Sequence, residues 1–473
     1  MLYAGLDIGT TNCRCLLVDE EGRSVAVAST EVAVEFGPPD RAEVCPEHWW
    51  NATCEVIGAA LRGAERPARE VAAVGLSGLM HAPVLIGTDA RPLGSAQLWM
   101  DQRCTPQAAA LQARFGSSHR RLDLRGSVSA PKLAWIAAHA PASIDAAQVV
   151  LLPKDFVRMR LTGDVATDRS DAIGTGLFDP DKGAWMEDVA QAAGVRADQL
   201  PPVRPASAPG GVISAKAAAA TGLAEGTPVA TGAADTLCTR LGAGQVEAGR
   251  LLVYLGTAAW VAVVEGTDEV SGVRASDAGA TTATGAALRW VRSLFSSQAD
   301  PLSYAALDEL AAGAPIGSAG ITFLPHLMGE RGPEFSPSAR GAWQGLTLAH
   351  GRNHLVRAVM EGAVFQLRRV LEAGVPPSTR DHASARVLGG ICRSVFWTQM
   401  LADATGLTVE IPREPEAAAR GAALLGARAA GLVTPDVGWP NPVVRVVEPD
   451  RTARADYEEA FQRFLACERH VGG

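Results

Sequence analysis

Two segments of this chain, far apart in the sequence, share one pattern of residue types. Residues 2–22 read LYAGLDIGTTNCRCLLVDEEG, and residues 251–266 read LLVYLGTAAWVAVVEG. Each has an apolar run, a Gly-Thr turn, a second apolar run and a charged turn, which predicts a strand, a tight turn and a second strand. Either the pattern recurs by chance in a glycine-rich chain, or the chain has two related halves that each begin with this strand–turn–strand unit.

Patterns elsewhere favour two related halves of α/β architecture. Residues 45–63 predict a helix with Pro46 in its first turn, and residues 71–79, VAAVGLSGL, predict a buried strand. In the second half, Asp300 and Gly313 are expected to cap and end a helix. One face of a further helix is predicted to carry Val356, Met360, Ala363, Leu367 and Val370. The stretch LPPVRPASAPGG, residues 200–211, predicts a surface connection.

Length and charge limit the classes of protein that fit. With 473 residues the chain is too long for one core, and its net charge of −8 argues against a surface that binds nucleic acid. Its four lysines, Lys132, Lys154, Lys182 and Lys216, do not follow a glycine, so the phosphate-loop motif G-x-x-x-x-G-K-[ST] is absent. The motifs G-x-G-x-x-G, H-E-x-x-H and G-x-S-x-G are absent as well.

The cysteines and the N-terminus indicate a cytoplasmic protein. The eight cysteines are scattered, which favours reduced thiols over a disulfide framework. The N-terminal apolar stretch is interrupted by Asp7, so a signal peptide is not expected, and no apolar run reaches the length of a membrane span.

Three glycine-containing turns are candidates for binding phosphate. They are Gly9-Thr10-Thr11, Gly256-Thr257 and Gly389-Gly390. Glycine lets backbone N–H groups approach phosphate oxygens closely, and threonine hydroxyls add uncharged donors. Each turn, taken alone, is equally consistent with an ordinary tight hairpin.

Two aspartates follow apolar strands, where burying a carboxylate is costly without a partner. Asp7 and Asp235 each lie beside small residues at such a strand end. One could hold a magnesium ion, since Mg²⁺ prefers oxygen ligands, and the other could accept a proton during phosphoryl transfer. The alternative is that each carboxylate caps the backbone of its own turn.

Two further segments carry side chains that suit a sugar. The segment GLMH ends a predicted strand with Met80 and His81, and LWMDQR brings Trp99, Asp101 and an arginine together. An aromatic face with polar groups is typical of sugar binding. A structural histidine and a solvated helix start are the alternatives for these segments.

Nearly the whole chain, in order, resembles the FGGY family of carbohydrate kinases, and within it the xylulokinase branch. The resemblance rests on LDIGTTNCRCLLVDEEGR, GLSGLMHAPVLIGTDARPLGSAQLWMDQR, LLPKDFVRMRLTGDVATDRSDAIGTGLFD, GTPVATGAADTLCTRLGAG and VYLGTAAWV, and continues through MGERGPEFSPSARG and VLGGICRSVFWTQMLADATGLTV. It implies two ribonuclease-H-like domains of the actin and hexokinase type with a nucleotide cleft between them. Residues 1–242 would bind sugar and catalyse, and residues 243–473 would bind the nucleotide.

The resemblance also implies a role for each candidate residue. Asp235 would be the catalytic base and would contact the substrate, and Asp7 would be a catalytic residue that holds Mg²⁺. The sugar would lie at Met80, His81, Trp99 and Asp101. ATP would be bound by Thr10, Thr11, Asn12, Arg14, Gly256, Thr257, Gly389 and Gly390. The partners implied are a small sugar and ATP, and the assembly implied is a homodimer.

The function expected is transfer of the γ-phosphate of ATP to a hydroxyl of a ketopentose, D-xylulose in the first place. Leu79 stands where the xylulokinase pattern has glutamine, which puts the identity of the sugar in question. The alternatives are an FGGY kinase for gluconate, ribulose, erythritol or glycerol, and a non-catalytic protein that senses nucleotide or sugar. An actin-like ATPase on the same fold is disfavoured by the continuous match to sugar-kinase segments.

Overall fold

The chain forms two compact units. The computed structural model describes residues 1–38, 40–116, 123–244, 246–266, 274–297, 301–380, 383–434 and 438–471. The first unit takes the described residues up to Gly244 and those between Glu416 and Pro440, and the second takes the other described residues from Val246 to Pro415 and from Asn441 onward. The predicted division at residue 242 placed 416–440 in the second half, whereas contacts group this segment with the first unit.

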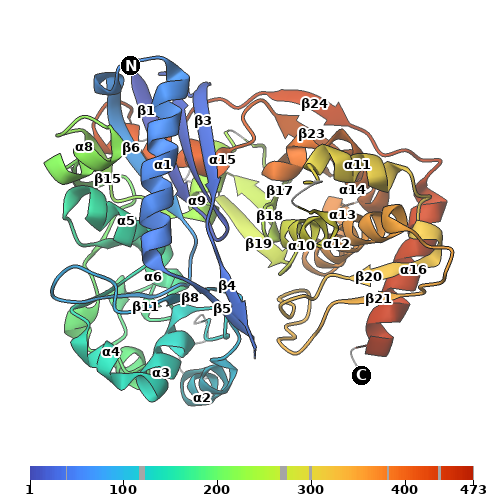
Figure 1. Cartoon of the computed structure of the whole chain (residues 1–473), viewed down its shortest axis with the longest axis horizontal. Helices are drawn as coiled ribbons and strands as arrows, with labels where there is room; N and C mark the ends of the chain where they lie inside the picture. The colour runs from blue at the N-terminus through green and yellow to red at the C-terminus, as the bar shows by residue number, and fades with distance from the viewer. Residues whose placement is uncertain are drawn as a thin grey trace. The chain divides into compact units, whose positions relative to one another are not determined.

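A seven-stranded sheet forms the core of the first unit (Figure 1). Five strands run in the order β15-β6-β1-β2-β3, with β14 beyond β15 and the short β16 beside the end of β6. β6 is parallel to β1, β15 and β16, whereas β2, β3 and β14 are antiparallel to their neighbours. The bounds are β1 Leu2–Ile8, β2 Asn12–Val18, β3 Ser24–Glu31, β6 Val71–Gly78, β14 Pro209–Val212, β15 Pro228–Ala230 and β16 Ala233–Ala234.

The second unit repeats this sheet with the same order and the same strand directions. Its strands run β24-β23-β22-β17-β18-β19, with β22 parallel to β17 and β23, and with β18, β19 and β24 antiparallel to their neighbours. The two related halves predicted from the repeated Gly-Thr pattern are therefore confirmed. The bounds are β17 Leu251–Leu255, β18 Ala259–Gly266, β19 Arg274–Ala280, β22 Ser384–Leu388, β23 Thr408–Pro412 and β24 Val443–Val447.

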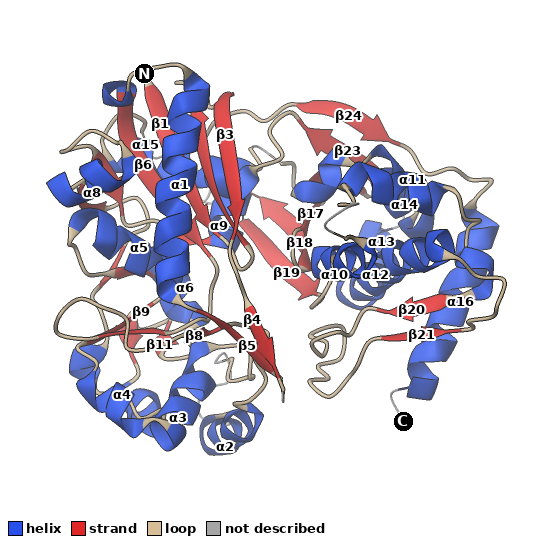
Figure 2. Cartoon of the chain, viewed as in Figure 1, coloured by secondary structure: helices blue, strands red, loops and turns tan. Residues whose placement is uncertain are grey.

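Helices and short strands complete each unit (Figure 2). The first unit's helices are α1 Pro46–Ala64, α2 Thr105–Phe115, α3 Ser129–His139, α4 Pro141–Ala146, α5 Pro153–Thr162, α6 Arg169–Gly174, α7 Glu187–Ala192, α8 Ala215–Thr221, α9 Asp235–Gly242 and α15 Ala417–Ala429. Those of the second are α10 Gly285–Phe295, α11 Tyr304–Ala312, α12 Arg352–Gly374, α13 Pro377–Arg380, α14 Val395–Thr405 and α16 Arg454–Val471. The 3₁₀ turns are η1 Ala68–Glu70, η2 Ala197–Gln199, η3 Ser318–Gly320 and η4 Gly390–Arg393. The short strands are β4 Glu35–Gly37, β5 Arg41–Val44, β7 Val84–Ile86, β8 Ala96–Gln97, β9 Val149–Leu151, β10 Thr167–Asp168, β11 Phe178–Asp179, β12 Ala184–Trp185, β13 Val203–Arg204, β20 Thr322–Leu324 and β21 Ala342–Gln344.

Several predicted helices form where the sequence placed them. α1 begins at Pro46 and packs against β2 and β3, and Glu65, in the left-handed conformation, follows its last residue. All five residues predicted for one face of α12 are buried. The predicted cap Asp300 lies outside the described residues. α11 instead begins after Ser303, whose hydroxyl accepts a hydrogen bond from the Ala306 N–H, and Gly313 follows its end as predicted.

The sequence suggested that residues 200–211 form a surface connection, but the end of this segment belongs to the first sheet. Its last residues begin β14, the edge strand of the first sheet, which pairs with β15 through an irregular register. Pro209 at the strand start explains why the pattern was misread, since proline is tolerated on edge strands and at first strand positions.

Helix α15 packs on the first sheet at unusually short range. A Cβ atom built on Gly5 in β1 would lie 1.7 Å from the Ala419 carbonyl oxygen, and one on Gly75 in β6 would lie 1.7 Å from that of Ala422. The same helix meets α9 in this way, because a Cβ on Gly421 would lie 1.9 Å from the Cys238 carbonyl oxygen. Glycine at these positions is therefore a steric requirement of the packing between α15, β1, β6 and α9.

All eight cysteines fall within the described residues, and no disulfide bond joins any of them there. Within the part of the chain that the structure describes, no helix has the length and hydropathy required to cross a membrane.

Replacing Gly75 with alanine tests the contact between α15 and β6. The added methyl group collides with backbone rather than with a flexible side chain, so we expect a loss of stability of about 1–3 kcal/mol or more. Gly94→Ala is the matched control, because a Cβ there has nothing within 4 Å. The urea midpoints of the two variants give the measurement, and equal midpoints would contradict the steric argument.

Candidate active site

Three neighbouring strands of the first sheet bring the two predicted aspartates to one edge. Asp7 of β1 is in register with Ser77 of β6, which is in register with Ala233 of β16. Asp235 begins α9 two residues after Ala233. Because adjacent strands are about 4.8 Å apart, Asp7 and the turn that carries Asp235 lie on the order of 10 Å apart. The carboxyl ends of these parallel strands therefore gather both carboxylates.

Asp7 is buried and has partners from the adjacent strands. Its side chain is on the sheet face that α15 covers, because Asp7 lies two residues after Gly5 and residues two apart in a strand share a face. Its Oδ1 accepts a hydrogen bond of 3.0 Å from the Ser77 hydroxyl. The Arg14 guanidinium lies 3.8 Å from Asp7 Oδ2 and 3.3 Å from a carboxylate oxygen of Glu416, the residue before α15. These contacts favour a strand-end site over the alternative in which Asp7 caps its own turn.

Burial raises the pKa of Asp7 above its usual value. The charge of Arg14 and the hydrogen bond from Ser77 lower the pKa and oppose this effect, while the charge of Glu416 adds to it. Since Arg14 is shared between two carboxylates, additional positive charge near Asp7 would stabilise its ionised form.

The residues around Asp7 fit a magnesium ion. The described residues contain no group of three or more histidine, cysteine, aspartate or glutamate side chains able to hold a metal. Mg²⁺ does not require such a cage, because it keeps several waters and is commonly held by one or two carboxylates together with substrate phosphates. A buried carboxylate with a raised pKa at the end of a strand matches this mode of binding.

The turn Gly9-Thr10-Thr11 connects β1 and β2 and begins two residues after Asp7. The Gly9 N–H donates to the Asn12 carbonyl, 2.9 Å away, and a Cβ on Gly9 would lie 2.7 Å from this oxygen. The Asn12 amide donates to the Thr11 hydroxyl at 3.3 Å. The Thr10 hydroxyl accepts a hydrogen bond of 3.0 Å from the Trp99 indole N–H, so the turn predicted for nucleotide and a residue predicted for sugar are in contact.

Met80 and His81 follow β6 on the same edge of the sheet. The hydroxyl of Thr236, the residue after Asp235, donates to the Met80 sulfur at 3.8 Å. His81 has a positive φ of 73°, and its Nδ1 lies 2.6 Å from the carbonyl oxygen of Gly174 in α6. Met80 therefore contacts the start of α9, and His81, the next residue, contacts the end of α6.

Asp101 makes its contacts with the protein itself. Its side chain is completely buried, and it accepts hydrogen bonds from the Ala42 N–H at 2.9 Å and from the Arg103 guanidinium at 2.7 Å. Arg103 also pairs with Glu43 and lies over the Trp135 ring. This network supports the segment that carries Trp99, whereas contact between Asp101 and a sugar stays a prediction.

The second unit has its two glycine turns at the ends of adjacent parallel strands. β17 and β22 pair with Tyr254 opposite Leu388, so Gly256 and Gly389 follow neighbouring strand ends. Gly389 has a φ of 92°, and a Cβ on it would lie 2.4 Å from the Leu255 carbonyl oxygen. The pairing of β1 and β6 has its counterpart here, and the structure brings together the four residues predicted for this part of the nucleotide site, Gly256, Thr257, Gly389 and Gly390.

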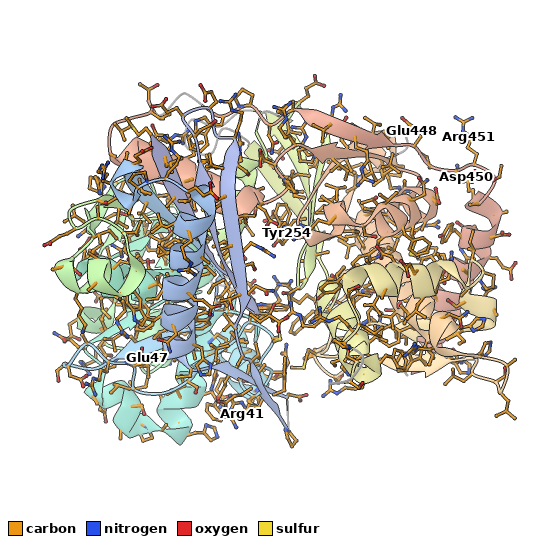
Figure 3. All side chains as sticks on the ribbon, turned by 45° about the horizontal axis from the view of Figure 1, so that its top comes forward. Arg41, Glu47, Tyr254, Glu448, Asp450 and Arg451 are labelled. Carbon is orange, nitrogen blue, oxygen red and sulfur yellow. The ribbon has the colours of Figure 1, made fainter. Side chains whose placement is uncertain are left out.

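Neighbouring groups hold the Gly256-Thr257 turn. The carbonyl oxygens of Gly256 and Thr257 accept hydrogen bonds of 3.0 Å from the Gly285 and Ala286 N–H groups at the start of α10. A Cβ on Gly256 would lie 2.7 Å from the Tyr254 hydroxyl oxygen, and Tyr254 is labelled in Figure 3. Glycine is therefore required at Gly389 by the Leu255 backbone and a positive φ, whereas at Gly256 the close neighbour is the side chain of Tyr254.

Sequence reasoning missed Ser77 and Glu416. Ser77 is a hydroxyl residue near the end of the apolar strand VAAVGLSG, and this polar residue in an apolar run, like Asp7 in LYAGLDI, was the signal that could have identified it. Glu416 lies 402 residues after Arg14 (416 − 14), and nothing local relates the two.

Comparison with known proteins agrees with this geometry. A model of the FGGY family of carbohydrate kinases, N-terminal domain, matches residues 2–242, and a model of the C-terminal domain matches residues 258–430. The xylulose kinase of Escherichia coli (strain K12) is 34% identical over 424 residues, which cover 86% of this chain and 85% of that protein.

Further relatives agree on the fold and differ in the substrate that they are named for. The crystal structure of a xyloylose kinase from Brucella ovis is 30% identical and covers 100% of this chain and 99% of its own, with a TM-score of 0.78. The gluconokinase of Bacillus subtilis (strain 168) is 28% identical over 458 residues, 91% of this chain and 88% of that protein. The predicted architecture of two actin- and hexokinase-type α/β domains is thereby confirmed.

Proposed function

Since this chain belongs to the FGGY family of carbohydrate kinases, we propose that it transfers the γ-phosphate of ATP to the 5-hydroxyl of D-xylulose. The observation that carries the proposal is the alignment of Asp7, Ser77 and Ala233 across three strands, with Asp235 beginning the next helix. The xylulose kinase relative matches over 86% of this chain, which supports D-xylulose as the substrate.

Asp235 is the general base in this proposal. It accepts the proton of the sugar hydroxyl as the hydroxyl oxygen attacks the γ-phosphorus in line and the bond to the ADP oxygen breaks. Its place is fixed by the fold, because Asp235 is the first residue of α9 and follows β16, which pairs with β6.

Donors from this chain bind the phosphates. Thr10, Thr11 and Asn12 supply polar groups after β1, Arg14 supplies a positive charge beside Asp7, and the Gly256-Thr257 turn supplies donors in the second unit. Gly389 and Gly390 leave space for the backbone to approach the adenosine. Asp7 would hold Mg²⁺, which when bound neutralises charge on the phosphate oxygens. These assignments keep the roles predicted from the sequence.

The sugar contacts are proposed at Met80, His81, Trp99 and Asp101, of which Met80 contacts Thr236 in the first turn of α9. One observation favours a second candidate function, a kinase for another sugar, aldonate or polyol such as gluconate. Leu79 is buried and apolar, so its side chain offers no hydrogen bond where the xylulokinase pattern has glutamine. The cytoplasmic location and the homodimer stay predictions.

A panel of acceptors tests the choice of substrate. With ATP and magnesium, we expect ADP release to depend on sugar and to be fastest with D-xylulose among ketopentoses, gluconate, erythritol and glycerol. A rate that is highest with gluconate or a polyol would contradict D-xylulose and support the second candidate. ADP release that is the same with and without every acceptor would contradict the kinase itself.

Replacing Asp235 with asparagine tests the general base. The variant keeps the size of the side chain and cannot take the proton, so we expect turnover to fall by at least about 10²-fold while ATP binding is unchanged. Asp89→Asn is the matched control, because that carboxylate is 62% exposed in a turn of the same unit and its loss should leave turnover unaltered. Full activity in Asp235→Asn would overturn the assignment.

A further inference from the structure

A lysine is buried in the first unit among three aspartates. Lys154 lies in the first turn of α5 with its side chain completely buried. Its Nζ is 2.6 Å from a carboxylate oxygen of Asp155, 3.0 Å from one of Asp168 and 3.0 Å from one of Asp171. Arg158 joins this group, 3.6 Å from Asp155. The mechanism above uses none of these charged residues.

Such a cluster is poorly explained by stability alone. Buried ion pairs repay their desolvation only in part, and well-packed apolar residues of similar size are often as stable. The cluster does hold the lysine and the three aspartates in a fixed arrangement. Burial alone would lower the pKa of Lys154, but the charges of Asp155, Asp171 and Asp168 raise it above its usual value, so the ammonium stays charged.

The cluster is connected to the residue before the proposed base. Asp168 precedes α6, and its Oδ2 accepts hydrogen bonds from the N–H of Ser170, at 2.7 Å, and from the Ser170 hydroxyl. The Ser170 oxygen in turn accepts a hydrogen bond of 2.9 Å from the N–H of Ala234. Ala234 is the N-cap of α9, and Asp235 is the next residue.

The direction of these hydrogen bonds is fixed by the charges. Because the Ser170 hydroxyl donates its hydrogen to the Asp168 carboxylate, its oxygen lone pairs face the Ala234 N–H. The Asp168 carboxylate is held in place by the ammonium of Lys154, whose Nζ lies 3.0 Å from its Oδ1. The Ala234 N–H therefore has an acceptor whose orientation depends on a buried ion pair.

The same short helix reaches the proposed sugar site. α6 carries Ser170 near its start and Gly174 as its last residue, and the Gly174 carbonyl oxygen lies 2.6 Å from the His81 ring. The last residue of β6 also packs on the cluster, since a Cβ on Gly78 would lie 2.7 Å from the Lys154 Cβ. Gly78 is in register with Ala234. The lysine cluster thus supports the strand end, the base and the histidine together.

We propose that Ser170 is a positioning residue for Asp235, and that Lys154 and Asp168 act through it. The Ser170 hydroxyl fixes the peptide that leads into α9 and so aims the Asp235 carboxylate. The proposal rests on the proposed function, because Asp235 is the base only in that function. It concerns orientation of the base and not binding of ATP.

Ser170→Ala and Ser170→Thr test the proposal with less risk to folding than a change at Lys154. Removing the hydroxyl deletes one hydrogen bond to the Ala234 N–H, so we expect the single-turnover rate of phosphoryl transfer to fall about tenfold. The KM values for ATP and sugar should stay within about twofold. Threonine keeps the hydroxyl and should restore the rate.

Ser214→Ala is the matched control. Ser214 is also a partly buried serine of the first unit, and its hydroxyl accepts a hydrogen bond from the Ala217 N–H at the start of α8. Its loss should lower the thermal midpoint and leave the transfer rate unchanged. Equal transfer rates in Ser170→Ala and Ser214→Ala, or a threonine variant as slow as the alanine variant, would overturn the proposal.

Hydrogen exchange separates this proposal from the proposed function. Amide exchange in the segment 230–237 should be faster in Ser170→Ala than in the natural protein and should be unchanged in Ser214→Ala. If the natural protein phosphorylates no acceptor, the proposed function fails, and the exchange experiment still decides whether Ser170 holds this turn. Identical exchange in Ser170→Ala and the natural protein overturns the proposal in either case.

Discussion

The candidate site in the first unit depends on how closely α15 approaches the sheet. Carbonyl groups of this helix occupy the space that side chains would need at Gly5 and Gly75, and Gly421 admits α9 in the same way. This packing brings Glu416 to Arg14 and so to Asp7, and it fixes α9, whose first residue is Asp235. Glu416 and α15, late in the sequence, thus contribute to a site formed mainly by β1 and β6. Close steric packing of the backbone holds them there.

The two sheets share one order and one set of strand directions, and each has a Gly-Thr turn after the first of two adjacent parallel strands. The chemistry proposed for them differs because the first unit adds β16 and α9 beside β6. That addition places a carboxylate next to the edge where Asp7 lies, one residue before the end of β1. The proposed general base therefore depends on elements that are added to the shared strand order in the first unit.

The parts of the fold predicted from sequence were those with local signals. The strand–turn–strand units around Gly9 and Gly256 have apolar runs and glycine turns, and α12 has regular apolar spacing. The edge strand β14 was missed because Pro209 resembles a loop residue. The pairing of Arg14 with Glu416 and that of Ser170 with Ala234 could not be predicted, because only the folded register brings these residues together. Spacing alone also left two interpretations of Asp7 open, and its contact with Ser77 on the neighbouring strand favours a site.

The most direct test of the central claim is the position of the phosphate in the product. D-Xylulose labelled with ¹³C at C5 would be converted with ATP, and the product examined by ³¹P and ¹³C NMR. Asp235 as base for a terminal hydroxyl predicts phosphorus–carbon coupling to C5 and one ADP for each sugar phosphate formed. A phosphate on another carbon, or ADP released without any sugar phosphate, would contradict the account.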